Sequence, residues 1–198
     1  MTIETPDDSR ADKKKLGYVG STPGSKAGRD SNAWFTPTRY IDAAREALGG
    51  VIDLDPFSDA KANEKISARK FFSEHDDAFN QDWSLGQQKP SKLTVWMNPP
   101  YSGALCSAAV SMFIDEYEKG SFAEGIFLVN NATETKWFQR AFTVASAVVF
   151  TNHRISFWNV DGKAMSGNTR GQAFFYFGKN PEKFIKAYKE IGAGFKLK

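Results

Sequence analysis

The residues that most often bind metals or cross-link chains are scarce in this sequence. Its 198 residues include a single cysteine, Cys106, and two histidines, His75 and His153, which stand far apart. One cysteine excludes a disulfide within the chain and a cysteine-based zinc site. We therefore predict no bound metal, although a site made of carboxylates alone stays open. Scarce cysteine also fits a reducing compartment, and we expect the protein to be cytoplasmic.

Long apolar runs are missing too. No segment approaches the roughly 20 apolar residues that a membrane-spanning helix needs, and the N-terminal residues have no apolar run of signal-peptide length. We therefore predict a soluble chain with no membrane partner. A strong charge of one sign is equally absent: the net charge of +3 permits a nucleic acid partner but does not by itself indicate one.

The sequence does contain enough apolar residues for one buried core. With 41% hydrophobic residues over 198 positions, it suits one domain better than two. Residues 1–30 are rich in Asp, Lys, Ser, Gly and Pro and have almost no apolar side chains, so we predict a flexible polar tail there. Residues 31–198 are predicted to form a single folded domain.

Helices and strands are predicted to alternate along this domain. Apolar residues at helical spacing predict helices at residues 38–48, 102–118, 133–142 and 181–191. Apolar runs predict strands at residues 51–55, 93–97, 125–129 and 147–150. Two further runs, 154–158 and 172–177, are rich in β-branched and aromatic residues and predict an antiparallel hairpin. Together these elements indicate an α/β fold whose mostly parallel sheet is covered on both faces.

Local signals mark the ends of the predicted helices. Thr38 is expected to cap the first helix, and Gly49-Gly50 to end it. Gly120 is expected to end the second helix, and Asn180-Pro181 provides a cap and a first-turn proline for the last one.

Polar residues follow two of the predicted strands directly. Asp53 and Asp55 stand at the end of the first strand, and Asn98 comes after the second. In sheets of this kind, ligands bind beyond the carboxyl ends of the strands. We therefore predict that both groups lie at a ligand-binding edge of the sheet.

The run Asn98-Pro99-Pro100-Tyr101 is the strongest candidate for a reaction centre. The prolines fix the backbone as it leaves the strand, which holds the Asn98 side-chain oxygen and the Pro99 carbonyl in place. Two such acceptors can bind both hydrogens of an aromatic amine, such as that of adenine, and leave the nitrogen lone pair free to attack an activated methyl group. That reaction needs positioning and charge stabilisation rather than a metal or a nucleophilic side chain. Tyr101 offers a ring for stacking an extruded base; the alternative is a rigid turn with a packed tyrosine.

Four motifs occur in a fixed order along the chain: Trp34-Phe35-Thr36-Pro37, Asp53-Leu54-Asp55-Pro56, Asp82-Trp83 and Asn98-Pro99-Pro100-Tyr101-Ser102. Together they resemble the phage-encoded Dam-like family of DNA N6-adenine methyltransferases. The resemblance implies a class I methyltransferase (Rossmann-like) three-layer fold, with a seven-stranded sheet that ends in an antiparallel hairpin. It also implies S-adenosylmethionine as methyl donor, double-stranded DNA as substrate, a catalytic role for residues 31–198, and a phage or prophage origin.

The resemblance also implies which residues bind the cofactor. Residues of the first motif, Phe35, Thr36 and Pro37, are similar to the segment that covers the methionine part of the cofactor. Residues of the second, Asp53, Asp55 and Pro56, match the loop in which a carboxylate can meet the cofactor ammonium group, and Asp82 is placed to line the adenine end. The chain departs from the usual methyltransferase pattern because no glycine-rich turn follows the first strand. Asp53 and Asp55 can instead be strand-end caps, and Trp83 can be core.

Contacts with DNA are predicted for the second half of the domain. Arg154, Lys163 and Arg170 flank or lie in the polar loop of the predicted hairpin, where they can contact phosphates; a solvated hairpin tip is the alternative. No large insertion is available as a separate recognition domain, so we predict short or relaxed sequence specificity.

Three other functions stay open from the sequence. The Asn-Pro-Pro-Tyr geometry can also present a glutamine amide of a protein, although that class would be expected to have the glycine-rich loop that is missing here. An RNA adenine is a second alternative substrate. An inactive nucleic-acid-binding relic that kept the fold is a third reading.

Overall fold

The computed structural model describes residues 35–88, 92–158 and 168–198. The predicted tail of residues 1–30, the predicted start of the domain at residues 31–34 and the predicted DNA contact Lys163 lie outside these ranges. The elements in chain order are α1 (Thr38–Ala47), β1 (Leu54–Asp55), α2 (Ala60–Ile66), β2 (Lys70–Phe71), the 3-10 helix η1 (Ala78–Asn80), β3 (Thr94–Met97), α3 (Gly103–Lys119), β4 (Glu124–Asn130), α4 (Lys136–Val144), β5 (Ala147–Thr151), β6 (Gln172–Phe177), α5 (Pro181–Ala187) and β7 (Gly192–Lys196).

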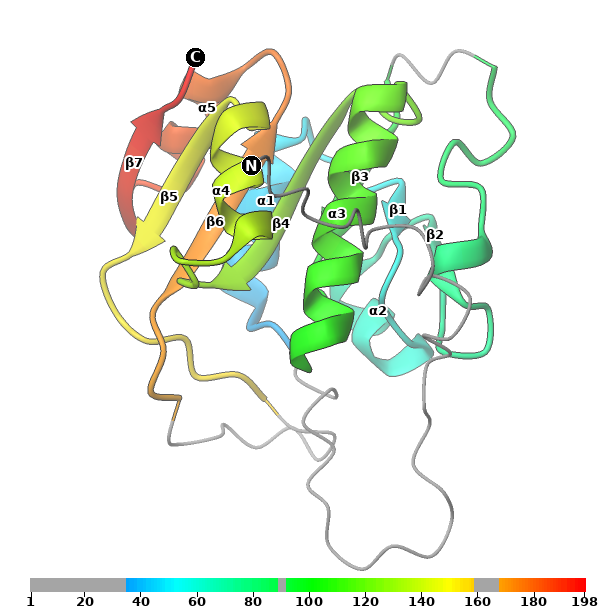
Figure 1. The fold of residues 1–198 in the computed structure, drawn as a ribbon, viewed down its shortest axis with the longest axis horizontal. Coiled ribbons are helices and arrows are strands. Elements are labelled where there is room, and N and C mark those ends of the chain that lie inside the picture. Colours follow the sequence, from blue (N-terminus) through cyan, green and yellow to red (C-terminus); the bar gives the residue numbers. More distant parts are fainter. Residues whose placement is uncertain (1–34, 89–91, 159–167) are drawn as a thin grey trace, which may run out of the picture.

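The strands form one seven-stranded sheet in the order β2-β1-β3-β4-β6-β5-β7 (Figure 1). β1 pairs in parallel with β2 and β3, and β3 pairs in parallel with β4. β6 is antiparallel to both β4 and β5, and β7 is antiparallel to β5. β5 therefore runs in the same direction as β1 to β4, and only β6 and β7 of these strands are reversed. The predicted mixed α/β architecture with a sheet that begins parallel is confirmed.

Helices cover both faces of this sheet (Figure 1). α3 and α4 bury one apolar cluster, to which they contribute Phe113 and Phe138, and α1, α2 and α5 bury a second, which contains Tyr40 and Phe184. Side chains of the strands alternate between the two clusters, because successive residues of a strand point to opposite faces. Each fully buried large side chain stabilises the fold by about 1.5–3 kcal/mol. The two cores thus hold the sheet between layers of helices and leave its carboxyl edge for polar residues.

The predicted hairpin of residues 154–158 with residues 172–177 is wrong. β6 (Gln172–Phe177) pairs along one side with β4 and along the other with β5. Both of its hydrogen-bonding edges are therefore occupied, and residues 154–158 have no place beside it. Within the described ranges, Trp158 of this segment instead forms an isolated antiparallel bridge with Phe35.

The polar region between the first two predicted strands contains elements that the sequence did not reveal. α2 (Ala60–Ile66) buries Ile66 but has no apolar stripe long enough to signal a helix, and β2 (Lys70–Phe71) is two residues long. β1 is also shorter than the predicted strand of residues 51–55, because only Leu54 and Asp55 have strand geometry.

Helix ends agree with the sequence signals in part. α1 ends before Gly49 and Gly50, whose φ angles of +87° and +102° suit glycine. Its N-cap, however, is Pro37 and not Thr38, and no side chain caps it. Gly120 ends α3 as predicted, with a φ of +84°. Asn180 precedes α5 without a side-chain capping bond, and Pro181 is in the first turn.

The C-terminal end of the chain differs most from the prediction. α5 ends at Ala187 and not at residue 191, and β7 (Gly192–Lys196) follows it along β5. The glycines of this strand hid it from sequence reading but are required, because a Cβ at Gly192 would lie 1.8 Å from the carbonyl oxygen of Phe150. None of the helices in the described part is long and apolar enough to span a membrane.

Candidate active site

The sheet brings the two predicted groups of polar residues to one edge. β1 and β3 are parallel neighbours in which Leu54 pairs with Val95. Asp55 is the last residue of β1, and Asn98 directly follows Met97, the last residue of β3. Both groups therefore lie at the carboxyl edge of the parallel strands, toward which the arrowheads of β4 and β5 point in Figure 1. This edge is where open α/β sheets bind ligands.

The Asn98-Pro99-Pro100-Tyr101 run connects β3 to α3. Pro99 and Pro100 are buried, and the side-chain oxygen of Asn98 is buried as well. Ser102 is the N-cap of α3, so the run is held between a fully buried strand and a long helix. Two proline rings and these anchors leave the backbone of Asn98 and Pro99 little freedom.

Tyr101 completes the motif with a half-buried ring. The ring packs edge-on against Phe157, with 5.9 Å between the ring centroids. Its hydroxyl is buried and has no hydrogen-bond partner among the described residues. Burial, followed by the nearby Cys106, raises the pKa of Tyr101 well above its ordinary value, so the phenol stays neutral.

Asp55 is a buried carboxyl without a cationic partner in the described part of the chain. The residue is 1% exposed, and its Oδ1 accepts a hydrogen bond from the Phe57 N–H at 3.3 Å. Burial raises the pKa of Asp55 to about 7, against the opposing effect of that hydrogen bond. A buried charge of this kind is costly unless a cation pairs with it. The site therefore favours a ligand that presents a positive group.

Asp53, in contrast, has both carboxylate oxygens engaged. Oδ2 accepts hydrogen bonds from the backbone N–H of Thr94 at 2.9 Å and from its hydroxyl at 3.1 Å. Oδ1 accepts from Arg69 Nη1 at 2.8 Å. These contacts tie the start of β1 to β3 and to the residue before β2, which is a structural role.

Residues 35–37 run along the same region before α1. The backbone of Phe35 is bridged to Trp158, and Pro37 is the N-cap of α1. Between them, Thr36 is 5% exposed, and its hydroxyl makes no hydrogen bond to any described residue. Buried hydroxyls are rarely left unsatisfied, so a bound ligand is a natural partner for this one.

Asp82 and Trp83 have different surroundings, and neither is left with a free polar group. The Asp82 carboxylate accepts hydrogen bonds from Ser84 N–H at 2.9 Å, the Ser84 hydroxyl at 2.7 Å and Gly86 N–H at 3.0 Å. These bonds, those from Ser84 first, lower the pKa of Asp82 and stabilise a surface turn. Trp83 is fully buried and donates from Nε1 to the carbonyl of Ala78 at 3.0 Å, so its core alternative holds.

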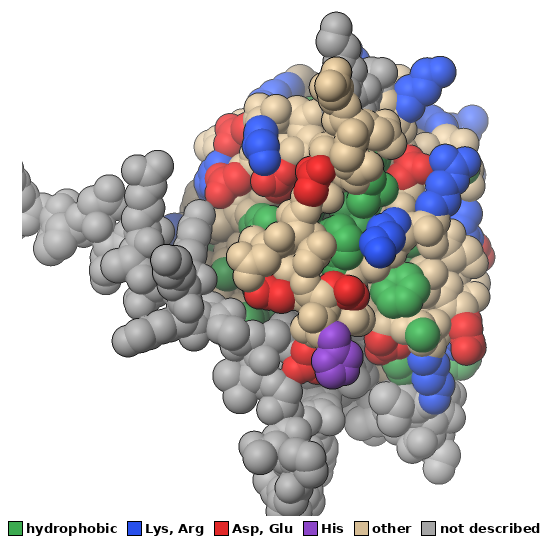
Figure 2. All heavy atoms as spheres, turned by 90° about the vertical axis from the view of Figure 1, so that its right-hand side faces the viewer, with side chains coloured by type: hydrophobic (Ala, Val, Ile, Leu, Met, Phe, Trp, Pro, Cys, Tyr) green, Lys and Arg blue, Asp and Glu red, His purple; other side chains and the backbone are tan. Residues whose placement is uncertain are grey.

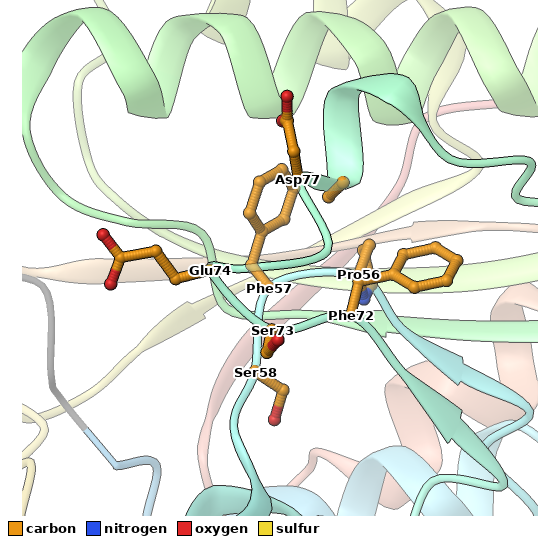
Figure 3. A pocket seen from close by; sticks show the side chains of 8 residues that line it. Pro56, Phe57, Ser58, Phe72, Ser73, Glu74 and Asp77 are labelled. Atoms are coloured by element: carbon orange, nitrogen blue, oxygen red, sulfur yellow. The ribbon is translucent and has the colours of Figure 1, made fainter. Parts of the chain in front are cut away.

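A small open pocket lies where β1 and β2 end (Figure 3). Pro56, Phe57 and Ser58, which follow β1, form one wall, and Phe72, Ser73 and Glu74, which follow β2, form another. Asp77 and Ala78 complete the lining. The sequence did not point to Glu74 because β2 was not predicted; the available signal was the apolar pair Phe71-Phe72 followed by a serine and an acid. Figure 2 views the side of the molecule on which β2 lies and shows acidic side chains close to apolar ones on this face.

The basic residues of the edge lie on the β5 and β6 side. Arg154 follows β5 and Arg170 precedes β6, and both are exposed. Neither forms an ion pair with another residue of the described ranges. Arg39 of α1, which sequence reading missed, reaches the same region, where its guanidinium contacts His153 Nε2 at 2.5 Å. Among the described residues, no group of three or more His, Cys, Asp or Glu side chains is arranged to bind a metal ion.

Comparison with known proteins assigns the chain to a family. Residues 24–191 match the family model described as DNA N-6-adenine-methyltransferase (Dam). The chain belongs to this family. The match begins inside the segment predicted as a tail and confirms the resemblance drawn from the four motifs.

A curated phage protein is also similar to this chain. The DNA N-6-adenine-methyltransferase of Escherichia phage T1 is 27% identical to it over 158 residues. The aligned region covers 72% of this chain and 60% of the phage T1 protein. The chain thus spans less than two thirds of that relative's length.

Proposed function

We propose that this chain transfers a methyl group from S-adenosylmethionine to the exocyclic N6 amine of adenine in duplex DNA. Membership of the Dam family supports the activity. The observation that carries the assignment is the placement of Asn98-Pro99-Pro100-Tyr101 at the end of β3, beside the end of β1, where the buried Asp55 has no cationic partner among the described residues. A site for the amine that receives the methyl group thus adjoins a site for a cationic ligand at one edge of the sheet. We assign this sheet to the class I methyltransferase (Rossmann-like) fold.

The residues of this edge fit S-adenosylmethionine. The ammonium group of its methionine part suits the Asp55 carboxylate, which no described cation neutralises. Thr36 offers a buried hydroxyl without a partner in the described ranges, and Phe35 and Pro37 flank it. Pro56 and Glu74 line the pocket at the ends of β1 and β2, where an acid can accept hydrogen bonds from ribose hydroxyls. When bound, the cofactor supplies a methyl group activated on a sulfonium.

Asp53 and Asp82 receive structural roles in this proposal. The oxygens of Asp53 are occupied by Thr94 and Arg69, and those of Asp82 by Ser84 and Gly86. Neither of them combines full burial with the lack of a cationic partner that Asp55 shows in the described part of the chain.

The motif residues act on the target amine by holding it. The Asn98 side-chain oxygen and the Pro99 carbonyl would each accept one N6 hydrogen, which favours a pyramidal nitrogen with its lone pair free. Methylation would break the bond between the methyl group and sulfur, leave a neutral thioether, and release one N6 hydrogen as a proton along one of these two hydrogen bonds. The rigid prolines hold the acceptors in position before the base arrives, so little reorganisation is needed. The Tyr101 ring stacks on the extruded adenine, and Phe157 supports that ring from the side. Base stacking of this kind is worth about 1–3 kcal/mol, which offsets much of the cost of extrusion.

The exposed arginines at the β5 and β6 side suit the DNA backbone. Arg154 and Arg170 can bind phosphates and thereby set the position of the duplex over the motif. A contact from Lys163 stays a prediction, because this residue lies outside the described ranges.

A labelling experiment tests the proposal. The purified chain is incubated with unmethylated duplex DNA and methyl-labelled S-adenosylmethionine, and the digested nucleosides are identified by mass spectrometry. We expect labelled N6-methyladenine, which Asn98→Ala abolishes. The control Asn180→Ala removes an exposed hydrogen bond to Glu124 beyond the other end of the sheet and should leave transfer unchanged.

Three other outcomes would overturn the proposal. Label in RNA but not in DNA would identify an RNA methyltransferase. Label in a protein glutamine would identify a protein methyltransferase. Failure to bind S-adenosylmethionine at all would identify a nucleic-acid-binding relic.

A further inference from the structure

Two segments carry the arginines that we propose as DNA contacts. We call residues 154–158 the first arm and residues 168–171 the second arm. The first arm follows β5, and the second leads into β6, which lies beside β5 in the sheet. Among the described residues, no ladder of backbone hydrogen bonds joins the two arms, so other contacts must connect them.

Side-chain amides join them. The Gln172 Oε1 atom accepts a hydrogen bond from the N–H of Ile155 at 3.2 Å, and Asn168 Nδ2 donates to the carbonyl of Ile155 at 2.9 Å. The N–H and the carbonyl of Ile155 are thus both hydrogen-bonded to side-chain amides, one from the second arm and one from the first residue of β6. These amides do what a paired residue does in a β-bridge.

The same two amides hold the backbone of Arg170. The Asn168 Oδ1 atom accepts from the Arg170 N–H at 3.1 Å, and Gln172 Nε2 donates to the Arg170 carbonyl at 2.8 Å. Gln172 Nε2 also donates to Asn130 Oδ1 at 3.0 Å, which anchors the assembly to the last residue of β4. We call Asn168 and Gln172 together the amide clasp.

Burial makes the clasp rigid. Gln172 and Ile155 are each 0% exposed, so breaking a hydrogen bond here leaves a buried polar group unsatisfied, which is unfavourable. The next inward-facing residue of the first arm, Phe157, is 5% exposed and packs against Tyr101. The clasp therefore fixes the backbone beneath Arg154 and Arg170 relative to the reaction motif, while both guanidinium groups stay in solvent.

We propose that Asn168 and Gln172 are positioning residues that hold Arg154 and Arg170 as one contact for two phosphates of the DNA substrate. The inference rests on the proposed binding of duplex DNA. Two charges on a fixed backbone bind without a large ordering cost, whereas the same charges on loose arms must be ordered by the DNA itself.

Salt-dependent binding tests this proposal. Affinity for a short unmethylated duplex is measured by fluorescence anisotropy at several salt concentrations for wild type, Asn168→Ala and Gln172→Met. Each phosphate contact contributes about one to the slope of log affinity against log salt. We expect each clasp variant to bind about tenfold more weakly with a slope smaller by roughly one to two, and to bind S-adenosylmethionine as wild type does.

Two controls separate positioning from stability. Asn152→Ala is the matched control, because this exposed asparagine lies at the start of the same connection but bonds to His153 and not to the clasp. It should leave DNA affinity unchanged. In an Arg154→Ala, Arg170→Ala background, the clasp substitutions should have no further effect, because the residues that they position are gone. Asn168 is only partly buried, so Asn168→Ala decides the question alone if Gln172→Met does not fold.

The outcomes are distinct. Clasp variants that keep both the affinity and the salt slope of the wild type would overturn the positioning role. So would additive losses in the double-arginine background. A wild-type chain that binds no duplex DNA would overturn the proposed function, and this inference with it.

Discussion

The main chains of Phe35 and Trp158 are joined by two reciprocal hydrogen bonds, from Phe35 N to Trp158 O at 2.9 Å and from Trp158 N to Phe35 O at 3.0 Å. This bridge connects the segment that we propose covers the cofactor to the first arm. The ammonium of Lys65 lies 4.0 Å from the centroid of the Trp158 ring, which adds α2 to the same junction. The cofactor and DNA sites that we propose would therefore share one segment of chain.

Loss of the Trp158 ring should weaken cofactor binding without removing a cofactor contact. The contact between this ring and Lys65 ties the residue that is bridged to Phe35 to α2, and a cation–π contact of this kind is worth about 0.5–2 kcal/mol. We expect Trp158→Ala to raise the dissociation constant of S-adenosylmethionine about threefold to tenfold in calorimetry, and Trp158→Phe to restore most of the affinity. Equal affinity of Trp158→Ala and wild type would show that the bridge does not support the cofactor segment.

Cofactor affinity should depend on pH through Asp55. Because burial raises the pKa of Asp55 to about 7, the carboxyl keeps its proton in the empty protein below that pH. Pairing with an ammonium group requires the charged form, so affinity should increase as the pH rises toward 7 and level off above it. Calorimetry from pH 5.5 to 8.5 checks this. Asp55→Asn should bind at least about tenfold more weakly at pH 8, with a flat profile.

Asp55→Asn and Asp53→Asn should change stability in opposite directions. The folded-state pKa of Asp55 lies above its unfolded value of 3.8, so this group costs the wild type stability as the pH rises from about 4 to 7. Asp55→Asn removes that cost, which is at most roughly 4 kcal/mol. Asp53→Asn breaks part of the network with Thr94 and Arg69, and should lower the free energy of unfolding by about 1–3 kcal/mol.

Urea unfolding at pH 5 and pH 8 measures both effects. Cofactor affinity provides the second readout, since Asp53→Asn should leave it unchanged once the protein is folded. A strong loss of cofactor binding in Asp53→Asn at full stability would instead place that carboxylate in the cofactor site.

The ring and the hydroxyl of Tyr101 should contribute differently to stability and to methyl transfer. The hydroxyl is buried and lacks a partner in the described part of the chain, so Tyr101→Phe should stabilise the protein by about 1 kcal/mol and keep methyl transfer within about threefold. Tyr101→Ala removes the stacking surface and should lower kcat/KM by about tenfold to a hundredfold. Thermal unfolding and single-turnover transfer measure these effects. A large loss of transfer in Tyr101→Phe would mean that the hydroxyl contacts a substrate.

The close approach of β7 to β5 should make Gly192 intolerant of any side chain. A Cβ there meets the backbone oxygen of Phe150 at 1.8 Å, so the strands must separate. We expect Gly192→Ala to lower the free energy of unfolding by about 2–4 kcal/mol. Ala193→Ser, at the exposed neighbouring position, should change stability by less than about 0.5 kcal/mol in the same denaturant titration. Equal midpoints for the two variants would show that β7 does not hold this register.

Much of this fold could be predicted because buried strands leave a strong signal. The runs that became β3, β4, β5 and β6 are almost entirely apolar, and each reappears within one or two residues of its predicted bounds. The position of the proposed reaction motif at the end of a strand could be predicted for the same reason, since it directly follows such a run. Proline and asparagine at the end of a buried strand are hard to explain by packing alone.

The errors come from segments whose structure depends on distant partners. Residues 154–158 have the composition of a strand, but β4 and β5 already occupy both edges of β6. β7 contains Gly192 and Gly194, which sequence rules read as breaks, although here they permit close approach. The difference between Asp53 and Asp55 was also inaccessible, because Arg69 and Thr94 reach Asp53 only in the folded chain.

The position of β6 between β4 and β5 also bears on how the chain is made on the ribosome. β5 is synthesised before β6 but has no sheet neighbour among the strands that precede it, since its partners are β6 and β7. The half-sheet from β2 to β4 can assemble during synthesis, whereas β5 must wait until Phe177 has emerged. Long-range strand insertion of this kind is slow and exposes apolar surface while it is incomplete. A chain cut short before residue 177 should therefore yield an aggregation-prone fragment rather than a weakened enzyme.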